Sequence, residues 1–464
     1  MSVKGNKLRK ATLELYRRNG KIHARTISGR FNTLRWLMVW LTQGIFYGLC
    51  WLNWESEGVS RQAVLFEIAH EKLYLFGLVL WPQDGLLLAI MLILSAIGLF
   101  FATTLAGRLF CGFACPQSVY TAIFTWVEAK IEGDHLERLR LDQSPLSAGK
   151  LARRLAKHVC WLLIAAWTGI TFVGYFTPLR DLLPALGRLQ LGPWEAFWLI
   201  FYSAFTYIQA GLTREMVCQH MCPYSRFQSV MVDEFTRTVS YDARRGEPRR
   251  SGTQATESAG DCVDCGICVQ VCPAGIDIRD GMQYPCINCG LCIDACDGVM
   301  SRIGASPGLI RFASEQELAG HPTARGWLGR PRLVVYAALF GVFALLGAYT
   351  LTSRSLLLVD VLRDRGNLAR TTPEGRIENA YTLRLMNLAE TAQEFEVSVS
   401  GMPGLRIEGN SSIRSEAGRT HTVPFSVSAP ASAGQARVQP IEFHVTARAA
   451  PAIHVNEKST FLLD

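Results

Sequence analysis

Eight of the 14 cysteines lie between Cys262 and Cys296, and they form one spacing written twice. Each run reads C-x2-C-x2-C-x3-C, and Pro273 follows the first run. Bacterial two-cluster ferredoxins use this spacing to hold [4Fe–4S] clusters through thiolates. Gaps of two residues let a tight loop direct three successive sulfurs inward, while the fourth cysteine of a run reaches the other cluster. The chain is therefore expected to form two linked loops around two electron-carrying clusters.

The pattern assigns four thiolates to each cluster. The first [4Fe–4S] cluster is expected on Cys262, Cys265, Cys268 and Cys296. The second is expected on Cys286, Cys289, Cys292 and Cys272. Gly266 and Gly290 occupy matching places in the two loops, where a residue without a Cβ is expected to let the backbone approach the inorganic sulfurs.

Zinc knuckles and disulfides are the alternatives for these cysteines. Zinc needs only four ligands for each site, in shorter pairs. A disulfide framework needs an oxidising compartment. The cluster interpretation is therefore preferred, and it makes the chain an electron carrier.

The composition indicates a membrane protein with soluble parts. The 464 residues carry 47 Lys and Arg against 39 Asp and Glu, a net charge of +8. The mean hydropathy is +0.16 in a chain that is 19% charged, which suggests long apolar segments separated by polar ones. Five uncharged windows reach the length of about 17–25 residues that crosses a bilayer. They are residues 36–54, 85–107, 158–179, 196–213 and 333–353.

The distribution of Lys and Arg predicts the orientation in the membrane. Residues 1–30 carry nine of them, whereas residues 55–84 carry two against five acidic residues. Residues 108–157 and 214–332 are basic again. The N-terminus and the cysteine runs are therefore expected in the reducing cytoplasm, and the C-terminus in the periplasm. This charge is attributed to loops at the lipid surface rather than to nucleic-acid binding, because no nucleic-acid-binding motif accompanies it.

The tail from about residue 355 onward alternates apolar and polar residues, as half-buried strands do. Strand-like runs occur at 381–387, 394–400, 422–427, 441–446 and 459–463. Short strands separated by turn residues over roughly 100 residues suggest a β-sandwich of the immunoglobulin type. Such a domain is expected to bind a partner rather than to carry out chemistry.

Four more cysteines form two matching CxxxCP motifs, and each motif follows an apolar window closely. They are Cys111, Cys115, Cys218 and Cys222. The proline after each motif disfavours a helical conformation at the preceding cysteine and suits the first turn of a new helix. We expect the two motifs to bring four thiols together near the inner membrane surface. Cys50 and Cys160 stand alone inside windows and are expected to be inert core residues.

Three uses of these four thiols remain open. Thiolates bind soft metals such as Cu(I), and Met216, His220 and Met221 would add compatible ligands. A dithiol could also carry electrons through a disulfide. Finally, free cysteines are often small buried residues with a structural role. The repetition of the motif with the same proline favours a functional role as copper or redox thiols, the candidate catalytic group.

These features predict a multi-domain membrane protein with an α-helical bundle of five spans, a ferredoxin-like insert and an all-β immunoglobulin-like sandwich. The expected segments are a basic cytoplasmic arm (1–35), a four-helix transmembrane region with two CxxxCP motifs (36–235), a flexible linker (243–260), a di-cluster ferredoxin-like domain (260–300), a fifth transmembrane helix (332–353) and a periplasmic domain (355–464).

Several of these motifs together resemble the CcoG/FixG/RdxA family of cytochrome c oxidase accessory proteins of Gram-negative bacteria. The resemblance is carried by Gly107-Arg-Leu-Phe-Cys111-Gly-Phe-Ala-Cys115-Pro-Gln, Val217-Cys-Gln-His-Met-Cys222-Pro-Tyr, the doubled cysteine run, and Gly308-Leu-Ile-Arg-Phe-Ala-Ser-Glu. It covers nearly the whole chain, although the single motifs also occur in membrane polyferredoxins of the NapH and NosR types. Asp297 follows Cys296 where ordinary ferredoxins have proline, a departure that resembles this family's version.

The resemblance implies a cupric reductase that supplies Cu(I) for assembly of a cbb-type cytochrome c oxidase. Its implied partners are a cytosolic electron donor, copper chaperones and an oxidase subunit. Two alternatives remain. One is a NapH-like protein that exchanges electrons with quinol, and the other is a non-enzymatic assembly scaffold whose clusters are structural.

Overall fold

A computed structural model describes residues 22–56, 59–250, 260–320, 329–364, 369–431 and 437–463. The chain divides into two compact units. The first comprises Met1–Trp54, Arg61–Ile68 and Ala89–Leu345, and the second comprises Glu55–Ser60, Ala69–Leu88 and Leu346–Asp464. Most of the predicted N-terminal arm (1–21) and the centre of the predicted linker (251–259) lie outside the described residues.

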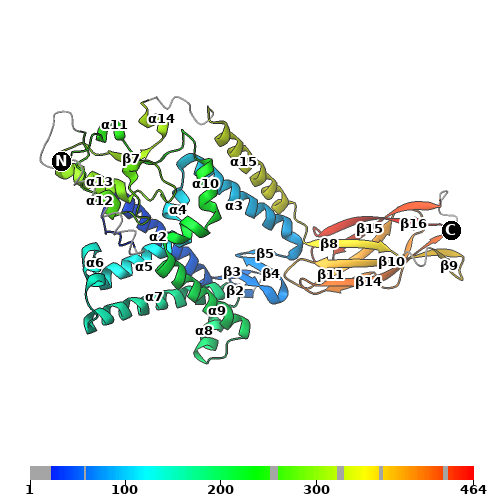
Figure 1. Cartoon of the computed structure of the whole chain (residues 1–464). Helices are drawn as coiled ribbons and strands as arrows, with labels where there is room; N and C mark the ends of the chain where they lie inside the picture. The colour runs from blue at the N-terminus through cyan, green and yellow to red at the C-terminus, as the bar shows by residue number, and fades with distance from the viewer. Residues whose placement is uncertain are drawn as a thin grey trace. The chain divides into compact units, whose positions relative to one another are not determined.

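Helices dominate the first unit (Figure 1). Its longer helices are α2 (Arg30–Gly48), α3 (Gly85–Ala106), α5 (Pro116–Glu132), α7 (Ala148–Gly174) and α9 (Pro193–Thr206), with α15 (Pro331–Thr352) at its end. Its shorter helices are α4 (Leu109–Phe113), α6 (His135–Gln143), α8 (Leu179–Gly187), α10 (Pro223–Met231), α11 (Ala243–Gly246), α12 (Ile267–Gln270), α13 (Leu291–Arg302) and α14 (Glu315–Leu318). The boundary between the units falls within α3 and α15.

Three of the described helices are long and apolar enough to cross a membrane. They span Pro82–Ala106, Ala148–Gly174 and Pro331–Thr352. They match three of the five predicted windows, so the expectation of five such helices is corrected to three. The chain is a membrane protein on this basis.

The other two windows are helical but differ from simple membrane helices. Window 36–54 ends its α-helix at Gly48, and α2 carries Arg35 and Gln43 on its buried face. Window 196–213 is α-helical only to Thr206, and Tyr207–Thr213 form a π-helix. The 14 residues of α9 rise by about 21 Å, which is shorter than the hydrocarbon core of about 30 Å. Uncharged length alone therefore did not predict where a regular helix stops.

The cysteine runs fold on a small scaffold within the first unit. Strands β6 (Thr238–Tyr241) and β7 (Ile310–Ala313) pair antiparallel, and they bracket the runs in the sequence. A buried core joins these strands to the loops and to α13 through Val239, Ile276, Ile293, Met300 and Ile310. The carboxylate of Asp294 accepts hydrogen bonds from the amides of Phe31 and Asn32 at 3.1 and 2.8 Å, so it fixes the start of α2 against α13.

The first part of the predicted linker is folded rather than flexible. Asp242 caps α11, and its side chain accepts a hydrogen bond from the amide of Arg245. The Arg245 guanidinium pairs with Asp261 at 2.6 Å and donates to the carbonyl of Pro307 at 2.9 Å. Low apolar content predicted flexibility here, but hydrogen bonds and an ion pair hold residues 243–246 against the cluster domain.

The second unit contains two antiparallel sheets. One has the order β12-β14-β10-β8, with β9 also paired to β10, and the other has the order β13-β11-β15-β16. The strands are β8 (Leu357–Arg363), β9 (Arg370–Thr371), β10 (Arg376–Asn387), β11 (Gln393–Ser400), β12 (Arg406–Glu408), β13 (Ser412–Ser415), β14 (Thr420–Pro430), β15 (Val438–Ala447) and β16 (His454–Leu462). The five runs predicted as strands fall largely within β10, β11, β14, β15 and β16, so this part of the prediction is confirmed.

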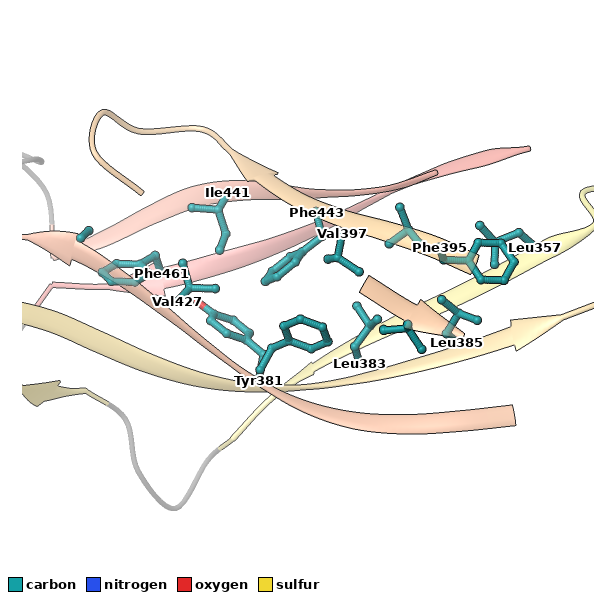
Figure 2. Packing of buried hydrophobic residues seen from close by; sticks show 14 of the residues in the cluster. Leu357, Tyr381, Leu383, Leu385, Phe395, Val397, Val427, Ile441, Phe443 and Phe461 are labelled. Atoms are coloured by element: carbon teal, nitrogen blue, oxygen red, sulfur yellow. The ribbon is translucent and has the colours of Figure 1, made fainter. Parts of the chain in front are cut away.

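Alternating side chains of the two sheets fill the sandwich core (Figure 2). Tyr381 on β10 and Phe443 on β15 meet edge to face, with ring centroids 5.2 Å apart. The Tyr381 hydroxyl donates to the carbonyl of Thr460 at 2.8 Å, so the buried polar atom is satisfied. The alternation that the sequence displays is thus the pattern of inward and outward residues on each strand.

Residues from before α3 also belong to the second unit. Strands β4 (Lys72–Leu75) and β5 (Leu78–Leu80) form an antiparallel pair. The indole of Trp81 donates to the carbonyl of Leu388 at 3.1 Å. Arg354, just after α15, forms an ion pair with Asp84 at 2.5 Å. The segment before α3 and the sandwich after α15 therefore share one folded unit.

Candidate iron–sulfur and thiol site

The eight cysteines of the doubled run surround two cavities. The first cavity is lined by Cys262, Cys265, Cys268 and Cys296. The second is lined by Cys272, Cys286, Cys289 and Cys292, with Cys268 also on its wall. The fourth cysteine of each run therefore lies with the first three of the other run, as the spacing predicts.

The donor sets fit cubane clusters better than single metal ions. Within the described residues, no three Cys, His, Asp or Glu side chains lie close enough together to hold one ion. A zinc site would need four donors at about 2.0–2.3 Å from one point. A cubane instead accepts its four thiolates at four separate irons, which suits cysteines that surround a space.

Each cysteine cavity has one arginine nearby. Arg279 lines the first cavity, and its guanidinium is bonded to Asp277 at 2.8 Å and to Asp264 at 2.5 Å. Although burial opposes its charge, the hydrogen bond to Asp277 raises the pKa of Arg279, so it stays cationic. Arg108 donates to the carbonyl of Cys286 at 3.3 Å beside the second cavity. These cations partly offset the negative charge that four thiolates bring.

The buried thiols favour the protonated state without a metal. Burial raises the pKa of Cys268, Cys272 and Cys296 to about 12 and that of Cys286 to about 11. Because ligands must be deprotonated, metal binding here releases protons. The same burial that disfavours free thiolates at these positions would shield a bound Fe–S cluster from water.

The backbone conformations of Gly266 and Gly290 give a further reason for glycine at these two places. Both have left-handed backbone conformations, with φ of 68° and 74°, and each precedes a helix directly as its N-cap. A Cβ at Gly290 would lie 2.7 Å from the ring of Phe31, whereas a Cβ at Gly266 would meet nothing within 4 Å. The glycines are required first by the positive φ of the turn.

The second set of cysteines lies at the starts of two helices. Cys115 is the N-cap of α5 and Cys222 is the N-cap of α10, each followed by proline at the first helical position. This confirms the prediction from the CxxxCP motif. Cys111 lies within α4, and Cys218 lies within a π-helix formed by Val217–Met221.

The four CxxxCP thiols are brought near one another. Burial raises the pKa of Cys111 to about 12, and repulsion from Cys115 and Cys218 adds to the shift. Burial raises the pKa of Cys218 to about 11, and repulsion from Cys115 and Cys222 adds to that shift. Burial also raises the pKa of Cys115, with Cys222 contributing in the same direction. Within the described residues, they do not form a group of three donors for one ion.

Hydrogen bonds hold the two CxxxCP motifs together. The thiol of Cys111 donates to Oε1 of Gln228 on α10 at 3.3 Å. The Arg108 guanidinium donates to the carbonyl of Ser225 at 2.8 Å, and the Ser225 hydroxyl donates to the carbonyl of Cys218 at 2.6 Å. The first motif is thereby attached to the helix that follows the second.

A buried charge network supports the same junction. Glu128 on α5 is fully buried and pairs with Arg214 at 2.7 Å, Arg138 at 3.6 Å and Lys157 at 3.7 Å. Lys157 on α7 also pairs with Glu132 at 2.7 Å. Because α5 begins at the first motif and Arg214 precedes the second, Glu128 links the two motifs through their flanking segments.

The first CxxxCP motif directly contacts the second cysteine cavity. A Cβ at Gly112 would lie 2.8 Å from the carbonyl oxygen of Ile287 and 3.1 Å from Cα of Cys289, so only glycine allows this approach. Arg108 donates to the carbonyl of Tyr284, and the Tyr284 hydroxyl lies 2.7 Å from the Ser225 hydroxyl. Thiols and cluster ligands therefore share one packed junction.

Sequence reasoning missed several residues of this junction, chiefly Arg108, Glu128 and Arg279. Arg108 was visible as part of the Gly107-Arg-Leu-Phe-Cys111 motif, where it could have been taken as a positive charge beside thiols. Glu128 had a signal too, since a carboxylate on the same helix as Phe124 and Val127 is unusual on a buried face. Arg279 could not be found from the sequence, because its partners Asp264 and Asp277 form no recognisable motif with it.

Together, the fold and the site define a class: membrane iron–sulfur proteins with a di-cluster ferredoxin region and a C-terminal β-sandwich domain. Profile comparisons agree with this class. Residues 213–315 match a 4Fe-4S dicluster domain, residues 88–132 match a 4Fe-4S binding domain, and residues 347–464 match the IG-like fold at the C-terminal of FixG.

The chain belongs to the FixG/RdxA family. It is 37% identical over 434 residues to the nitrogen fixation protein FixG of Rhizobium meliloti (strain 1021), covering 85% of this chain and 82% of that protein. It is 39% identical over 408 residues to protein RdxA of Cereibacter sphaeroides, covering 86% of this chain and 87% of that protein. A crystal structure of a FixG-related protein from Vibrio parahaemolyticus aligns with 24% of this chain and 97% of that chain, at 26% identity and a TM-score of 0.22.

Proposed function

We propose that this protein is a membrane oxidoreductase that reduces Cu(II) to Cu(I) at the CxxxCP thiols with electrons from two [4Fe–4S] clusters. The observation that carries the proposal is the contact of Gly112, inside the first motif, with the backbone of Ile287 and Cys289. A motif of thiols that bind soft metals thus adjoins a predicted cluster ligand. Delivery of Cu(I) for assembly of a cbb-type cytochrome c oxidase rests on the family resemblance.

The cluster ligands are proposed as the two sets that line the cavities. The first set is Cys262, Cys265, Cys268 and Cys296, and the second is Cys272, Cys286, Cys289 and Cys292. When bound, each cluster supplies or accepts one electron at a time. Arg279 and Arg108 lie beside the two sets and favour their thiolate forms.

The thiols favour the reduced product. One electron converts Cu(II) to Cu(I), and soft thiolates select Cu(I) over harder ligands. Arg108 assists, because its positive charge favours the thiolate form of Cys111 and Cys218 against the effect of burial.

Contacts within each unit support five membrane crossings even though only three helices meet the requirements of a simple span. The first CxxxCP motif contacts residues 287–289, so the chain between them must cross an even number of times. Helix α7 is one crossing, and α9 with its π-helical extension is the available second. Likewise the Thr26 hydroxyl donates to the carboxylate of Asp134, which places both residues on one side of the membrane. Because α2 and α3 lie between them in the sequence, α2 must cross if α3 does. The ion pair of Asp84 with Arg354 also requires an even number of crossings between these two residues, and α3, α7, α9 and α15 provide four.

This topology keeps the N-terminus and clusters in the cytoplasm and the sandwich in the periplasm, following the distribution of Lys and Arg. Labelling of whole cells with a membrane-impermeant thiol reagent tests it, with the unsubstituted protein as the blank. Leu146→Cys and Ile303→Cys place a cysteine at exposed positions on either side of α7 and α9 in the sequence. Both cysteines should escape labelling, because both are expected on the cytoplasmic side. If one is labelled and the other is not, α9 does not cross.

The reductase activity is tested on anaerobically purified, reduced protein. Addition of Cu(II) with a Cu(I)-specific chelator should bleach the reduced-cluster signal and form one Cu(I) for each electron lost. Replacement of Cys111, Cys115, Cys218 and Cys222 by Ser should slow this reaction, whereas Cys160→Ser provides the matched control. If the reduced protein keeps its electrons in the presence of Cu(II), the copper proposal fails.

The same variants separate the alternatives. A scaffold with structural clusters should support oxidase assembly even when its clusters cannot be reduced. A quinol-linked carrier should be reoxidised by quinone and should be indifferent to the four CxxxCP serine substitutions in the copper assay. Copper reduction that depends on both cysteine sets is expected only of the proposed function.

A further inference from the structure

A cavity of about 290 Å³ lies among α2, α5, α7 and α9, apart from the two cysteine cavities. Its walls include the aromatic side chains of Phe46, Phe172, Tyr202 and Phe205. The rings of Phe172 and Tyr202 are stacked, with centroids 3.5 Å apart. No charged side chain and no histidine lines it within the described residues. A flat, uncharged ligand is therefore favoured, while an anionic lipid headgroup or a haem is not.

Polar groups gather on one part of the lining. Gln43 is only 9% exposed, and its Oε1 has no hydrogen-bond partner within the part of the chain that the structure describes. Tyr120 lies beside it, and the Tyr47 hydroxyl links Tyr120 at 3.3 Å to Thr168 at 2.9 Å. Burial raises the pKa of Tyr120, so its hydroxyl keeps its proton. Because the Thr168 hydroxyl donates to the carbonyl of Ile164 at 2.8 Å, the Tyr47 hydroxyl donates to Thr168 and the Tyr120 proton is directed to Tyr47. The lining thus offers one unused acceptor, Oε1 of Gln43, beside a hydroxyl that donates only a long hydrogen bond of 3.3 Å.

The cavity also adjoins both the first CxxxCP motif and a candidate membrane helix. Ala114 and Pro116, the neighbours of Cys115 in the sequence, line it. Thr168 and Phe172 belong to α7, which is long and apolar enough to cross the membrane. Phe205 on α9 lines the cavity and is 43% exposed. A ligand that dissolves in the hydrocarbon could therefore enter from the lipid.

We propose that this cavity binds the ring of a membrane quinone or quinol. The ring is flat and uncharged, its carbonyl oxygen can accept from the Tyr120 hydroxyl in place of the Tyr47 oxygen, and a quinol hydroxyl can donate to Oε1 of Gln43. Small-molecule sites typically combine apolar walls with a few convergent polar groups, at volumes from about 300 Å³ upward. The isoprenoid tail would leave past Phe205. The proposal concerns binding, and it holds whether or not copper is the electron acceptor.

The test uses full-length protein in lipid nanodiscs and decylubiquinone as the probe. Saturable binding is followed by quenching of tryptophan fluorescence. Gln43→Leu and Tyr120→Phe each remove one polar partner at nearly constant volume. Each should weaken binding about tenfold, the effect of losing one buried hydrogen bond. Tyr336→Phe, on α15 and outside the cavity, is the matched control and should bind as the unsubstituted protein does.

Cluster absorbance of each variant reports whether it is folded, and Thr168→Val replaces any variant that loses this absorbance. Decanol, which carries a chain without a quinone ring, separates ring recognition from insertion of a lipid chain. Decanol should displace the probe poorly. Equal displacement by decanol, or unchanged affinity in the polar variants, would show an apolar crevice for acyl chains and overturn the proposal. Either result leaves the copper assay unaffected, so the two proposals fail separately.

Discussion

The two sets of cysteines differ in what brings them together. The eight thiols of the doubled run lie within 35 residues of sequence, and short loops with the glycine N-caps of α12 and α13 arrange them around two cavities. The four CxxxCP thiols come from motifs that are about 100 residues apart. Tertiary contacts alone hold them near one another.

This difference separates two kinds of chemistry. A set fixed by local spacing can hold a permanent cofactor, because its geometry survives small movements elsewhere in the protein. A set fixed by distant helices depends on the network around Glu128 and on the hydrogen bonds of Arg108 and Ser225. Such a junction suits a transient ligand. The comparison predicts that damage to the first set removes a cofactor, while damage to the second changes affinity and rate.

The largest effect is expected from Cys289→Ser. Cys289 lines the second cavity and lies in the core that α13 buries. Loss of one thiolate should remove the second cluster, leaving roughly half of the iron, and should abolish electron transfer to the CxxxCP thiols. Iron analysis and the spectrum of the reduced cluster measure this. Cys160→Ser should keep all the iron, and full iron content in Cys289→Ser would contradict the assignment.

A smaller but still large effect is expected from Glu128→Gln. The substitution keeps the volume but leaves Arg138 and Arg214 buried without their counter-charge. Breaking a buried ion pair on one side costs about 3–5 kcal/mol, so thermal unfolding in detergent should shift down markedly while both clusters remain before heating. Arg154→Gln breaks the exposed pair with Asp142 and should cost below about 1 kcal/mol. Equal shifts would show that the network is not structural.

The same contrast explains what the sequence could predict. Spacing within each run predicted which cysteines line each cavity, and alternation predicted five strands of the sandwich, since both depend on neighbouring residues. The reach of Arg108 to Tyr284 and the use of Glu128 depend on residues far apart, so no local pattern revealed them. The windows at 36–54 and 196–213 were overestimated as regular spans, because absence of charge says nothing about a π-helix at Tyr207–Thr213.

A moderate effect of pH is expected at the CxxxCP thiols. Burial raises the pKa of Cys111 to about 12 and that of Cys218 to about 11, so between pH 6 and 9 both are protonated thiols. Cu(I) binding must displace these protons, and affinity should rise about tenfold per pH unit for each proton released. Competition with a Cu(I) chelator across this range measures the slope. Cys218→Ser should reduce the slope by one proton, and a flat profile would exclude thiolate binding.

The smallest effect is expected from Gly112→Ala, which tests the junction between the two sets directly. The added Cβ would lie 2.8 Å from the Ile287 oxygen and 3.1 Å from Cα of Cys289, so the first motif must move away from the second cavity. Electron transfer from the clusters to Cu(II) should slow severalfold, because the distance grows, while the iron content stays unchanged. Stopped-flow reoxidation of the reduced protein measures the rate. Gly149→Ala, where a Cβ meets nothing within 4 Å, is the matched control. An unchanged rate in Gly112→Ala would mean that electrons leave the clusters by another route.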